Sequence, residues 1–259
     1  MRINHTLDQL HNLILGVNQT SSDIAHDLKH PIGRLRQKLD EARVNAQSVE
    51  EFRTATCRAL GEIDTIVETF EALLRITQLE AGAGKKRFAP LDMKELLGDL
   101  ADAYGAVIED EGFRLGTSID TRCDAFISGD RELLTQLFAN LIENAIRHTP
   151  KGTLISLRLM VDDRNLTVSL RDTGPGIPEA EREKVFRRLY RLEKSRSTPG
   201  SGLGLSLVAA IVQLHGAKIT LSNNQPGLCV QIVFPRIIQT ASANLSVRMG
   251  SMKAQVDAL

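Results

Sequence analysis

The 259-residue sequence contains no tryptophan, and its aromatic residues amount to only 4% of the chain. Proteins that bind single-stranded nucleic acid stack the bases on aromatic side chains, so no such platform is expected here. Neither sign of charge is in excess, because 32 lysine and arginine residues balance 32 aspartate and glutamate residues. A strongly basic binding protein is therefore not indicated, and we expect no nucleic-acid partner.

Cysteine is scarce, and long apolar runs are missing. Cys57, Cys123 and Cys229 are odd in number, far apart in the chain and form no CxxC pair. This usage predicts reduced thiols in a cytosolic protein and argues against a disulfide framework or a zinc site. No apolar run approaches the roughly 18 residues that a membrane-spanning helix needs, and no signal peptide is visible, so we expect this portion to be soluble.

The first 80 residues have the apolar pattern of two long amphipathic helices. In residues 1 to about 46, apolar residues alternate at spacings of three and four, which is a heptad seam. A second helix is predicted from about Val49 to Leu79, with Ser48 as its N-cap. A hairpin of two such helices cannot bury its own apolar stripe, so the pattern predicts a homodimer that forms a four-helix bundle. The positions that carry the pattern are Leu7, Leu10, Ile14, Val17, Ile24, Leu28 and Leu35, followed by Phe52, Ala59, Ile63, Ile66, Phe70 and Leu73.

After a glycine-containing linker at residues 80–86, the pattern changes to mixed α and β. Asp92 and Asp130 are predicted N-caps, and residues 162–165 form a hairpin turn. The residues past about 236 show no periodicity and are expected to form a flexible tail. The predicted helices are 92–111, 131–148 and 203–215, and the predicted strands are 114–119, 126–128, 154–161, 166–171, 218–222 and 229–234.

His26 occupies an outward position on the first helix, the f position of the heptads. Asp27 follows directly, and Pro31 removes a backbone donor, so the helix should bend there. An exposed imidazole beside a carboxylate can act as a nucleophile. From this stretch alone, an ordinary surface histidine on a coiled coil is an equally good interpretation.

Asn140, Asn144, Arg147 and His148 share one face of the helix at residues 131–148. Two amides one turn apart can offer oxygen ligands to Mg²⁺ when phosphates and water complete the shell. Without further context, the same pattern is typical of the polar face of an amphipathic helix.

Two glycine-containing stretches follow. Asp172 comes directly after a strand and precedes Gly174 and Gly176, which let the backbone approach a ligand closely. A carboxylate accepts a hydrogen bond from the exocyclic amine of adenine and repels the carbonyl of guanine. Such a stretch is, however, more often an ordinary turn. Residues 200–205 open a helix, where backbone amides and the positive helix end suit a polyphosphate. A Rossmann interpretation is disfavoured, because the glycines come late and after a loop.

In combination, these stretches resemble the motifs of sensor histidine kinases. His26 to Ile32 resembles the H-box, residues 140–148 the N-box, residues 172–177 the G1 box, residues 186–191 the F-box and residues 200–205 the G2 box, and they occur in the family's order and at its spacing. The resemblance implies a helical hairpin forming a dimeric four-helix bundle, followed by an α/β sandwich of the Bergerat ATP-binding fold, with three helices packed on a mixed sheet.

The resemblance also implies roles for individual residues. His26 is the phosphoacceptor, and Asn144 is the Mg²⁺ ligand. Arg191 contacts the γ-phosphate, and the span 178–201 forms a mobile lid over ATP. Asp27, Lys29 and His30 complete the catalytic group around His26. The implied cofactors are ATP and Mg²⁺. The residues implied to bind ATP are Asn140, Asn144, Arg147, His148, Asp172, Gly174, Gly176, Ile177, Tyr190, Arg191, Gly200, Gly202, Leu203, Gly204 and Leu205.

Four departures or extensions of the pattern matter. Asn140 stands where gyrase-type ATPases carry a water-activating glutamate, which favours phosphoryl transfer over hydrolysis. His30 stands where the family has Thr or Asn, which puts phosphatase activity in doubt. Leu189 replaces the usual Phe of the F-box. Residues 1–20 resemble the last helix of a HAMP linker, which implies a cytoplasmic portion of an inner-membrane sensor anchored through missing N-terminal segments.

The implied organisation is a HAMP-like helix end at 1–20, a dimerisation and phosphotransfer domain at 21–84, a catalytic domain at 85–236 and a tail at 237–259. The implied partner is the receiver domain of a response regulator. Two alternatives from other classes stay open at this point: an ATP-binding dimeric scaffold without autokinase activity, and a serine kinase of the same ATP fold.

Overall fold

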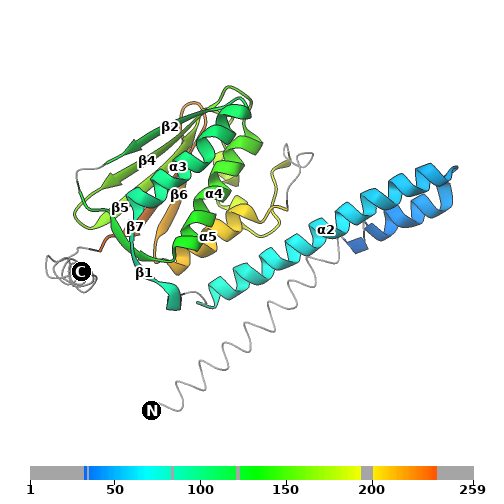
Figure 1. The fold of residues 1–259 in the computed structure, drawn as a ribbon, viewed down its shortest axis with the longest axis horizontal. Coiled ribbons are helices and arrows are strands. Elements are labelled where there is room, and N and C mark those ends of the chain that lie inside the picture. Colours follow the sequence, from blue (N-terminus) through cyan, green and yellow to red (C-terminus); the bar gives the residue numbers. More distant parts are fainter. Residues whose placement is uncertain (1–31, 34, 83–84, 121–122, 194–200, 238–259) are drawn as a thin grey trace, which may run out of the picture. The chain divides into compact units, whose positions relative to one another are not determined.

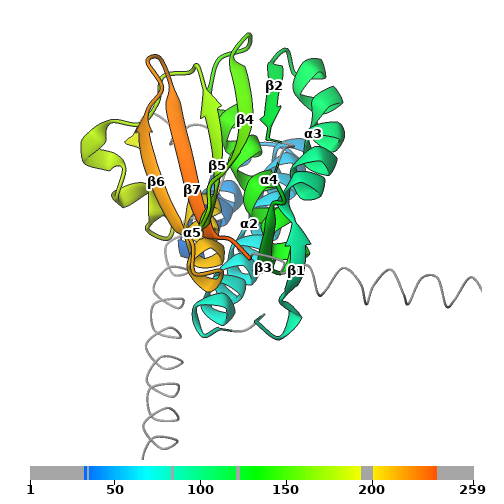
Figure 2. The ribbon, with the colours of Figure 1, turned by 90° about the vertical axis from the view of Figure 1, so that its left-hand side faces the viewer.

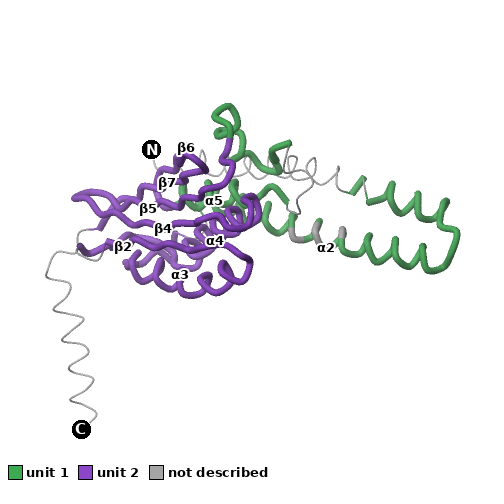
Figure 3. The backbone as a smooth tube through the Cα atoms, turned by 90° about the horizontal axis from the view of Figure 1, so that it is seen from above, with its two compact units in different colours: residues 1–83, 178–214 green, residues 84–177, 215–259 purple. Residues whose placement is uncertain are grey.

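The computed structural model describes residues 32–33, 35–82, 85–120, 123–193 and 201–237. The backbone divides into two compact units (Figure 3). The first comprises residues 1–83 and 178–214, and the second comprises residues 84–177 and 215–259. The two helices of the predicted hairpin fall in the first unit, and the β-sheet falls in the second.

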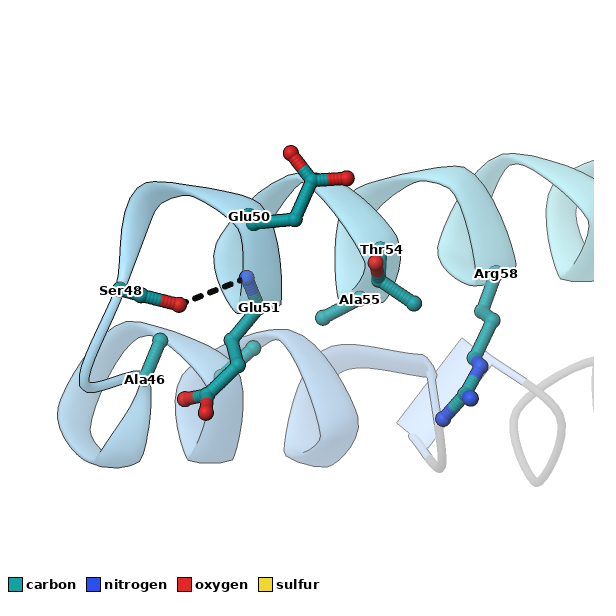
Figure 4. Close-up of a pocket in the computed structure, with 8 residues that line it drawn as sticks. Ala46, Ser48, Glu50, Glu51, Thr54, Ala55 and Arg58 are labelled. Atoms are coloured by element: carbon teal, nitrogen blue, oxygen red, sulfur yellow. Dashed lines mark hydrogen bonds between the residues drawn. The ribbon is translucent and has the colours of Figure 1, made fainter.

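The hairpin is formed by a helical segment at residues 35–45 and the long helix α2 (Val49–Glu80), which runs back along it (Figures 1 and 4). Ser48 caps α2 as the sequence predicts, because its hydroxyl oxygen accepts from the Glu51 N–H at 3.1 Å. Glu50 and Glu51 place negative charge at the positive end of the helix. A shallow groove at this end of the hairpin is lined by Ala42, Ala46, Ser48, Glu50, Glu51, Thr54, Ala55 and Arg58.

Helix α2 carries apolar residues on two faces. Leu73, Ile76 and Leu79 are buried in the C-terminal half, where α2 packs against helix α5 (Gly204–Leu214) of the same unit. A second row is exposed in the single chain, with side chains such as Leu60 at 57% and Val67 at 49%. The predicted seam is therefore divided: Ala59 and Leu73 are buried, Ile66 is partly exposed, and the other three members are exposed. The exposed row consists of Phe52, Leu60, Ile63, Val67, Phe70 and Leu74.

The first unit also contains the segment that precedes α5. Two short 3₁₀ turns, η2 (Glu179–Glu181) and η3 (Lys184–Phe186), lie in it, and η3 contacts α5. Arg188 forms an ion pair with Glu80, the last residue of α2. Glu80 lies at the negative end of a helix that has no basic residue in its last turn, so the guanidinium offsets an unfavourable charge.

The second unit is built on a five-stranded mixed sheet in the order β2-β4-β5-β7-β6, which Figure 2 shows side by side. β2 runs parallel to β4, and the other neighbours are antiparallel. Ile155, Leu157 and Leu159 are buried at alternate positions of β4, so this face of the sheet forms the core. The strand bounds are β2 Arg114–Ile119, β4 Leu154–Val161, β5 Asn165–Asp172, β6 Lys218–Asn223 and β7 Leu228–Pro235.

Helices α3 (Met93–Asp110) and α4 (Arg131–His148) cover the sheet, with α3 contacting β2 and α4 contacting β5 (Figure 2). Both predicted caps are confirmed, because Asp92 accepts from the Lys94 N–H and Asp130 accepts from two N–H groups of the first turn of α4. The Arg131 guanidinium pairs with carboxylates of α3 and ties the two helices together. The unit is an α/β sandwich, as expected.

A second, two-stranded sheet lies beside the N-termini of these helices. β1 (Ala89–Asp92) pairs antiparallel with β3 (Phe126–Gly129), and each strand leads into a helix. The short connector η1 (Lys85–Arg87) precedes β1. Within the described part of the chain, no helix is long and apolar enough to span a membrane.

Candidate nucleotide-binding site

The predicted site residues of the second unit come from the end of α4 and the end of β5. Asn140 and Asn144 are half-buried on α4, while Arg147 and His148 are exposed in its last turn. The Asn140 amide nitrogen donates to the backbone oxygen of Gln136 at 2.9 Å, which fixes the orientation of that side chain. The Asn144 Nδ2 atom is buried and has no hydrogen-bond partner among the described residues.

Asp172 ends β5 and is 5% exposed. Its Oδ1 atom accepts from the backbone N–H of Gly174 at 2.8 Å and from that of Leu228 at 3.3 Å. Because both donors point at Oδ1, Oδ2 is the oxygen left to accept from a ligand. Burial raises the pKa of Asp172, and the two backbone hydrogen bonds partly counter this effect.

Gly174 and Gly176 allow backbone contacts that a side chain would prevent. A Cβ atom on Gly174 would lie 2.4 Å from Cγ2 of Thr149, the residue that follows α4. The stretch after β5 therefore packs directly on the C-terminal end of α4, and the structure brings the Asn144 helix and Asp172 into one local arrangement. Gly176 has a φ of +69°, and a Cβ there would lie 2.9 Å from the Gly227 carbonyl oxygen.

The predicted site residues of the first unit form another group. Gly202 has a φ of +74°, and a Cβ atom on it would meet Leu189 C and Arg191 Cγ at 3.0 Å. The glycine-rich stretch that leads into α5 is thus packed against the segment 189–191, so the structure brings residues of these two predicted motifs together. Leu203 is buried, and Gly204 and Leu205 are partly exposed. Ile177, which belongs to the second unit, is also partly exposed.

The segment that carries Arg191 is held by a small polar cluster. The Tyr190 hydroxyl donates to Glu181, and the Lys184 ammonium pairs with the same carboxylate at 3.0 Å. These hydrogen bonds lower the pKa of Glu181, with the bond from Tyr190 as the largest cause. Leu189 adopts a φ of +57°, which is strained for a branched side chain. The strain falls at a predicted functional motif, where such backbone conformations are concentrated.

The comparisons with known proteins agree with this geometry. The family of histidine kinase-, DNA gyrase B-, and HSP90-like ATPases matches residues 129–238. The sensor protein SphS of Synechococcus elongatus is 32% identical over 216 residues, which are 80% of this chain and 51% of that protein. The chain is similar to sensor histidine kinases, and residues 129–238 carry the matched ATPase domain. It spans about half the length of the curated relatives it matches.

Solved structures support the fold described above. The catalytic domain of the histidine kinase ThkA, in a nucleotide-free form, is 27% identical with a TM-score of 0.52, covering 57% of this chain and 97% of that one. ThkA in complex with the response regulator protein TrrA gives a TM-score of 0.64 over 91% of this chain and 66% of that one. At 20% identity the second likeness concerns the fold alone. The Bergerat-type α/β sandwich, with an ATP-binding domain, is therefore confirmed.

Several predicted residues lie outside the described residues. They are His26, Asp27, Lys29 and His30 of the first helix, and Gly200 of the glycine-rich stretch. Their roles remain predictions.

The structure also adds site residues that sequence reasoning missed. Thr149, Asn224, Gly227 and Leu228 all contact the Asp172–Gly176 stretch, either directly or through backbone atoms. Asn224 and Leu228 lie more than 50 positions away in the chain, so no local motif contains them. The only sequence signal was a turn-like Asn-Asn-Gln-Pro-Gly run between two predicted strands.

The carboxylates at the two ends of β5 should titrate in a fixed order. Burial raises the pKa of Asp172, whereas hydrogen bonds from the Arg164 and Asn165 N–H groups lower the pKa of Asp162. As pH falls, Asp172 should protonate above the ordinary aspartate value and Asp162 below it. A ¹³C carboxyl NMR titration of the full chain measures both, with Asp→Asn variants to assign the signals.

The signs for stability follow from this order. A raised folded-state pKa means that ionised Asp172 destabilises the fold at neutral pH, and this loss is relieved as pH falls through that pKa. The lowered pKa of Asp162 gives stability that is present above the unfolded value and is lost as pH falls. If Asp172 titrated at or below Asp162, the burial argument for the adenine-facing carboxylate would be wrong.

Proposed function

We propose that this chain is an ATP-dependent protein-histidine kinase that phosphorylates itself on His26 and passes the phosphoryl group to an aspartate of a response regulator. The observation that carries the proposal is the buried Asp172 carboxylate, which keeps Oδ2 for a ligand beside the end of the helix that bears Asn144. A carboxylate in this setting accepts from the exocyclic amine of adenine and disfavours guanine. Similarity to sensor histidine kinases connects this nucleotide site to phosphoryl transfer.

The protein's own residues divide the work as follows. His26 attacks the γ-phosphorus through Nε2, while the bond from that phosphorus to the β,γ-bridging oxygen breaks and ADP leaves. Asp27 accepts a hydrogen bond from the other ring nitrogen, which fixes the tautomer. Arg191 lies against the γ-phosphate, and the amides at the start of α5 hold the phosphate chain. Lys29 offsets phosphate charge. Positioning and charge stabilisation supply most of the rate, because phosphoryl transfer asks for little covalent chemistry.

The side chains near Asn144 fit a magnesium ion whose ligands come mostly from the phosphates of ATP and from water. Among the described residues, no group of three or more His, Cys, Asp or Glu side chains is suited to holding a metal. The buried Nδ2 atom of Asn144 has no hydrogen-bond partner within the described ranges, and a rotation of the amide presents its oxygen there. One amide oxygen, together with phosphate and water oxygens, is the shell that Mg²⁺ prefers. The ion supplies neutralisation of the phosphate charge when bound.

The exposed apolar row on α2 supports the proposal of a homodimer. Leu60, Ile63, Val67, Phe70 and Leu74 follow one another at spacings of three and four, and all are exposed in the single chain. Two copies that pair along this row form the four-helix bundle of the proposed domain 21–84, next to a catalytic domain at 85–236.

The wider setting is also proposed from the family. The solved ThkA structure contains a response regulator protein, and a receiver domain of that kind is the partner proposed here. Membrane anchoring through segments outside this sequence would make the chain the cytoplasmic part of an inner-membrane sensor. Phosphatase activity stays in doubt, because His30 replaces the usual Thr or Asn.

The decisive experiment is incubation of the full chain with γ-labelled ATP and Mg²⁺, followed by acid or base treatment. We expect covalent label that is lost in acid and retained in base, which is the behaviour of phosphohistidine. Acid-stable label would indicate a serine kinase of the same fold. ATP binding without any covalent label would favour the second candidate function, a dimeric scaffold that uses ATP as a conformational switch, for which the hairpin and the nucleotide site alone would suffice.

A further inference from the structure

The turn that joins β6 to β7 makes several contacts with the adenine-facing aspartate. The Asn224 side-chain nitrogen donates to the Asp172 backbone oxygen at 2.8 Å, and the Leu228 N–H donates to Asp172 Oδ1. The turn is closed on itself, since the Asn224 N–H donates to the Gly227 carbonyl oxygen at 3.0 Å. The turn and the first residue of β7 thus bind both the main chain and the side chain of Asp172.

The packing between the turn and this aspartate leaves no room for adjustment. Gly227 has a φ of +110°, and a Cβ atom on it would lie 1.8 Å from the Asp172 backbone oxygen. From the other side, the Gly227 carbonyl oxygen blocks any Cβ on Gly176. The turn is therefore wedged between the two ends of the Asp172–Gly176 stretch, and its displacement would move both.

The neighbouring strand holds the same stretch from the opposite side. The Thr173 hydroxyl accepts from the Leu154 N–H, and the Thr173 N–H donates to the Leu154 carbonyl oxygen at 3.2 Å. With β4 on one side and the β6–β7 turn on the other, the peptide between Asp172 and Thr173 has a fixed plane. The direction of the Asp172 side chain follows from that plane.

We propose that Asn224 and Gly227 of the β6–β7 turn, with Leu228 at the start of β7, form a positioning element of the adenine site. Asn224 is the positioning residue that sets the selectivity for adenine over guanine. Asn224 holds the Asp172 backbone oxygen, Leu228 occupies Oδ1, and Oδ2 is left aimed at the exocyclic amine of the base. Recognition of this kind requires placement to within about 0.5 Å, so the loss of one anchor weakens it. The inference rests on the proposed nucleotide binding and adds to it a residue outside the recognised motifs.

The alternative is that Asn224 only stabilises the β6–β7 turn. If the role is structural, substitution of Asn224 lowers the unfolding temperature and weakens the binding of every ligand in proportion. If the role is positioning, the substitution weakens the binding only of ligands that carry adenine, because other residues contact the phosphates. The two roles are separated by comparing ATP, GTP and inorganic tripolyphosphate on the same variant.

The experiment uses the full chain with Mg²⁺ and measures the Kd of each ligand by calorimetry, together with the unfolding midpoint. Asn224→Ala removes the amide. The isosteric Asn224→Asp keeps the volume but replaces the donor with an oxygen that faces the Asp172 carbonyl. For both variants we expect ATP affinity to fall about tenfold, while GTP and tripolyphosphate change by less than about twofold. Gln225→Ala is the matched control, because it removes an exposed amide from the same turn, and it should leave ATP affinity unchanged.

Two results overturn the inference alone: unchanged ATP affinity in both Asn224 variants, or a parallel loss for all three ligands that follows the unfolding midpoint. Failure of the unsubstituted chain to bind ATP overturns the proposed function and this inference with it. The two failures are therefore distinguished by the unsubstituted chain.

Discussion

Replacement of Asp172 by asparagine is expected to weaken ATP binding about 100-fold while leaving the fold intact. The asparagine Oδ1 can still accept from the Gly174 and Leu228 N–H groups, so the local structure is retained. The other end of the side chain becomes an NH₂ group, which opposes the exocyclic amine of adenine with a second donor. Calorimetric titration with ATP and GTP measures the effect, and the preference for ATP over GTP should fall because the new donor matches the guanine carbonyl.

Asp162→Asn is the matched control for this prediction. Asp162 undergoes the same chemical change on the same sheet, but at the opposite end of β5, where it caps the exposed β4–β5 turn. ATP affinity should stay within about twofold of the unsubstituted chain. An equal loss in both variants would mean that the effect of Asp172→Asn is not local to the base.

Replacement of His26 by alanine is expected to reduce incorporation of γ-labelled phosphate to background, whereas His30→Ala retains it. The imidazole is the proposed nucleophile, and no neighbouring group can replace it. His30 is followed by Pro31 and not by an acid, so it lacks the partner that Asp27 provides for His26. ATP affinity should be unchanged in both variants, because the nucleotide-binding motifs lie elsewhere in the chain. Label that persists on the His26→Ala chain would reject the assignment.

Features that depend on neighbouring residues were predicted well from the sequence. Ser48, Asp92 and Asp130 were predicted as N-caps, and each accepts the expected backbone hydrogen bonds. Helix α4 and strands β2 and β4 have the predicted bounds, because turn residues and apolar periodicity delimit them. The bounds of β5, β6 and β7 differ by one residue at some ends, where strand pairing extends past the alternating pattern.

Features that depend on distant pairing were missed. Strand β1 contains Pro90, and its four residues do not alternate, so only its pairing with β3 makes it a strand. The contacts of Asn224 and Leu228 with Asp172 bridge more than 50 residues and have no local signal. Asp172 was predicted from the sequence to face the base, which stays a prediction, whereas the residues that hold it in place were not predicted.

The division of the apolar seam on α2 has a similar cause. Phe52, Ile63 and Phe70 lie on the exposed row of α2, and the prediction that a second copy covers this row stays a prediction. Periodicity cannot tell which apolar residues meet α5 of the same chain and which stay exposed, because both sets obey the same spacing. That assignment required the fold.

The two hairpin turns of the large sheet have opposite consequences for engineering. The β4–β5 turn at residues 162–165 is exposed, and the Asp162 carboxylate stabilises it by accepting hydrogen bonds from within the turn. We therefore expect a fluorophore tag or reporter peptide inserted there to change ATP binding and stability little. The β6–β7 turn is equally short, yet it is wedged against Asp172. We expect an insertion there to displace Asp172, and so to give a chain that still folds but no longer binds ATP.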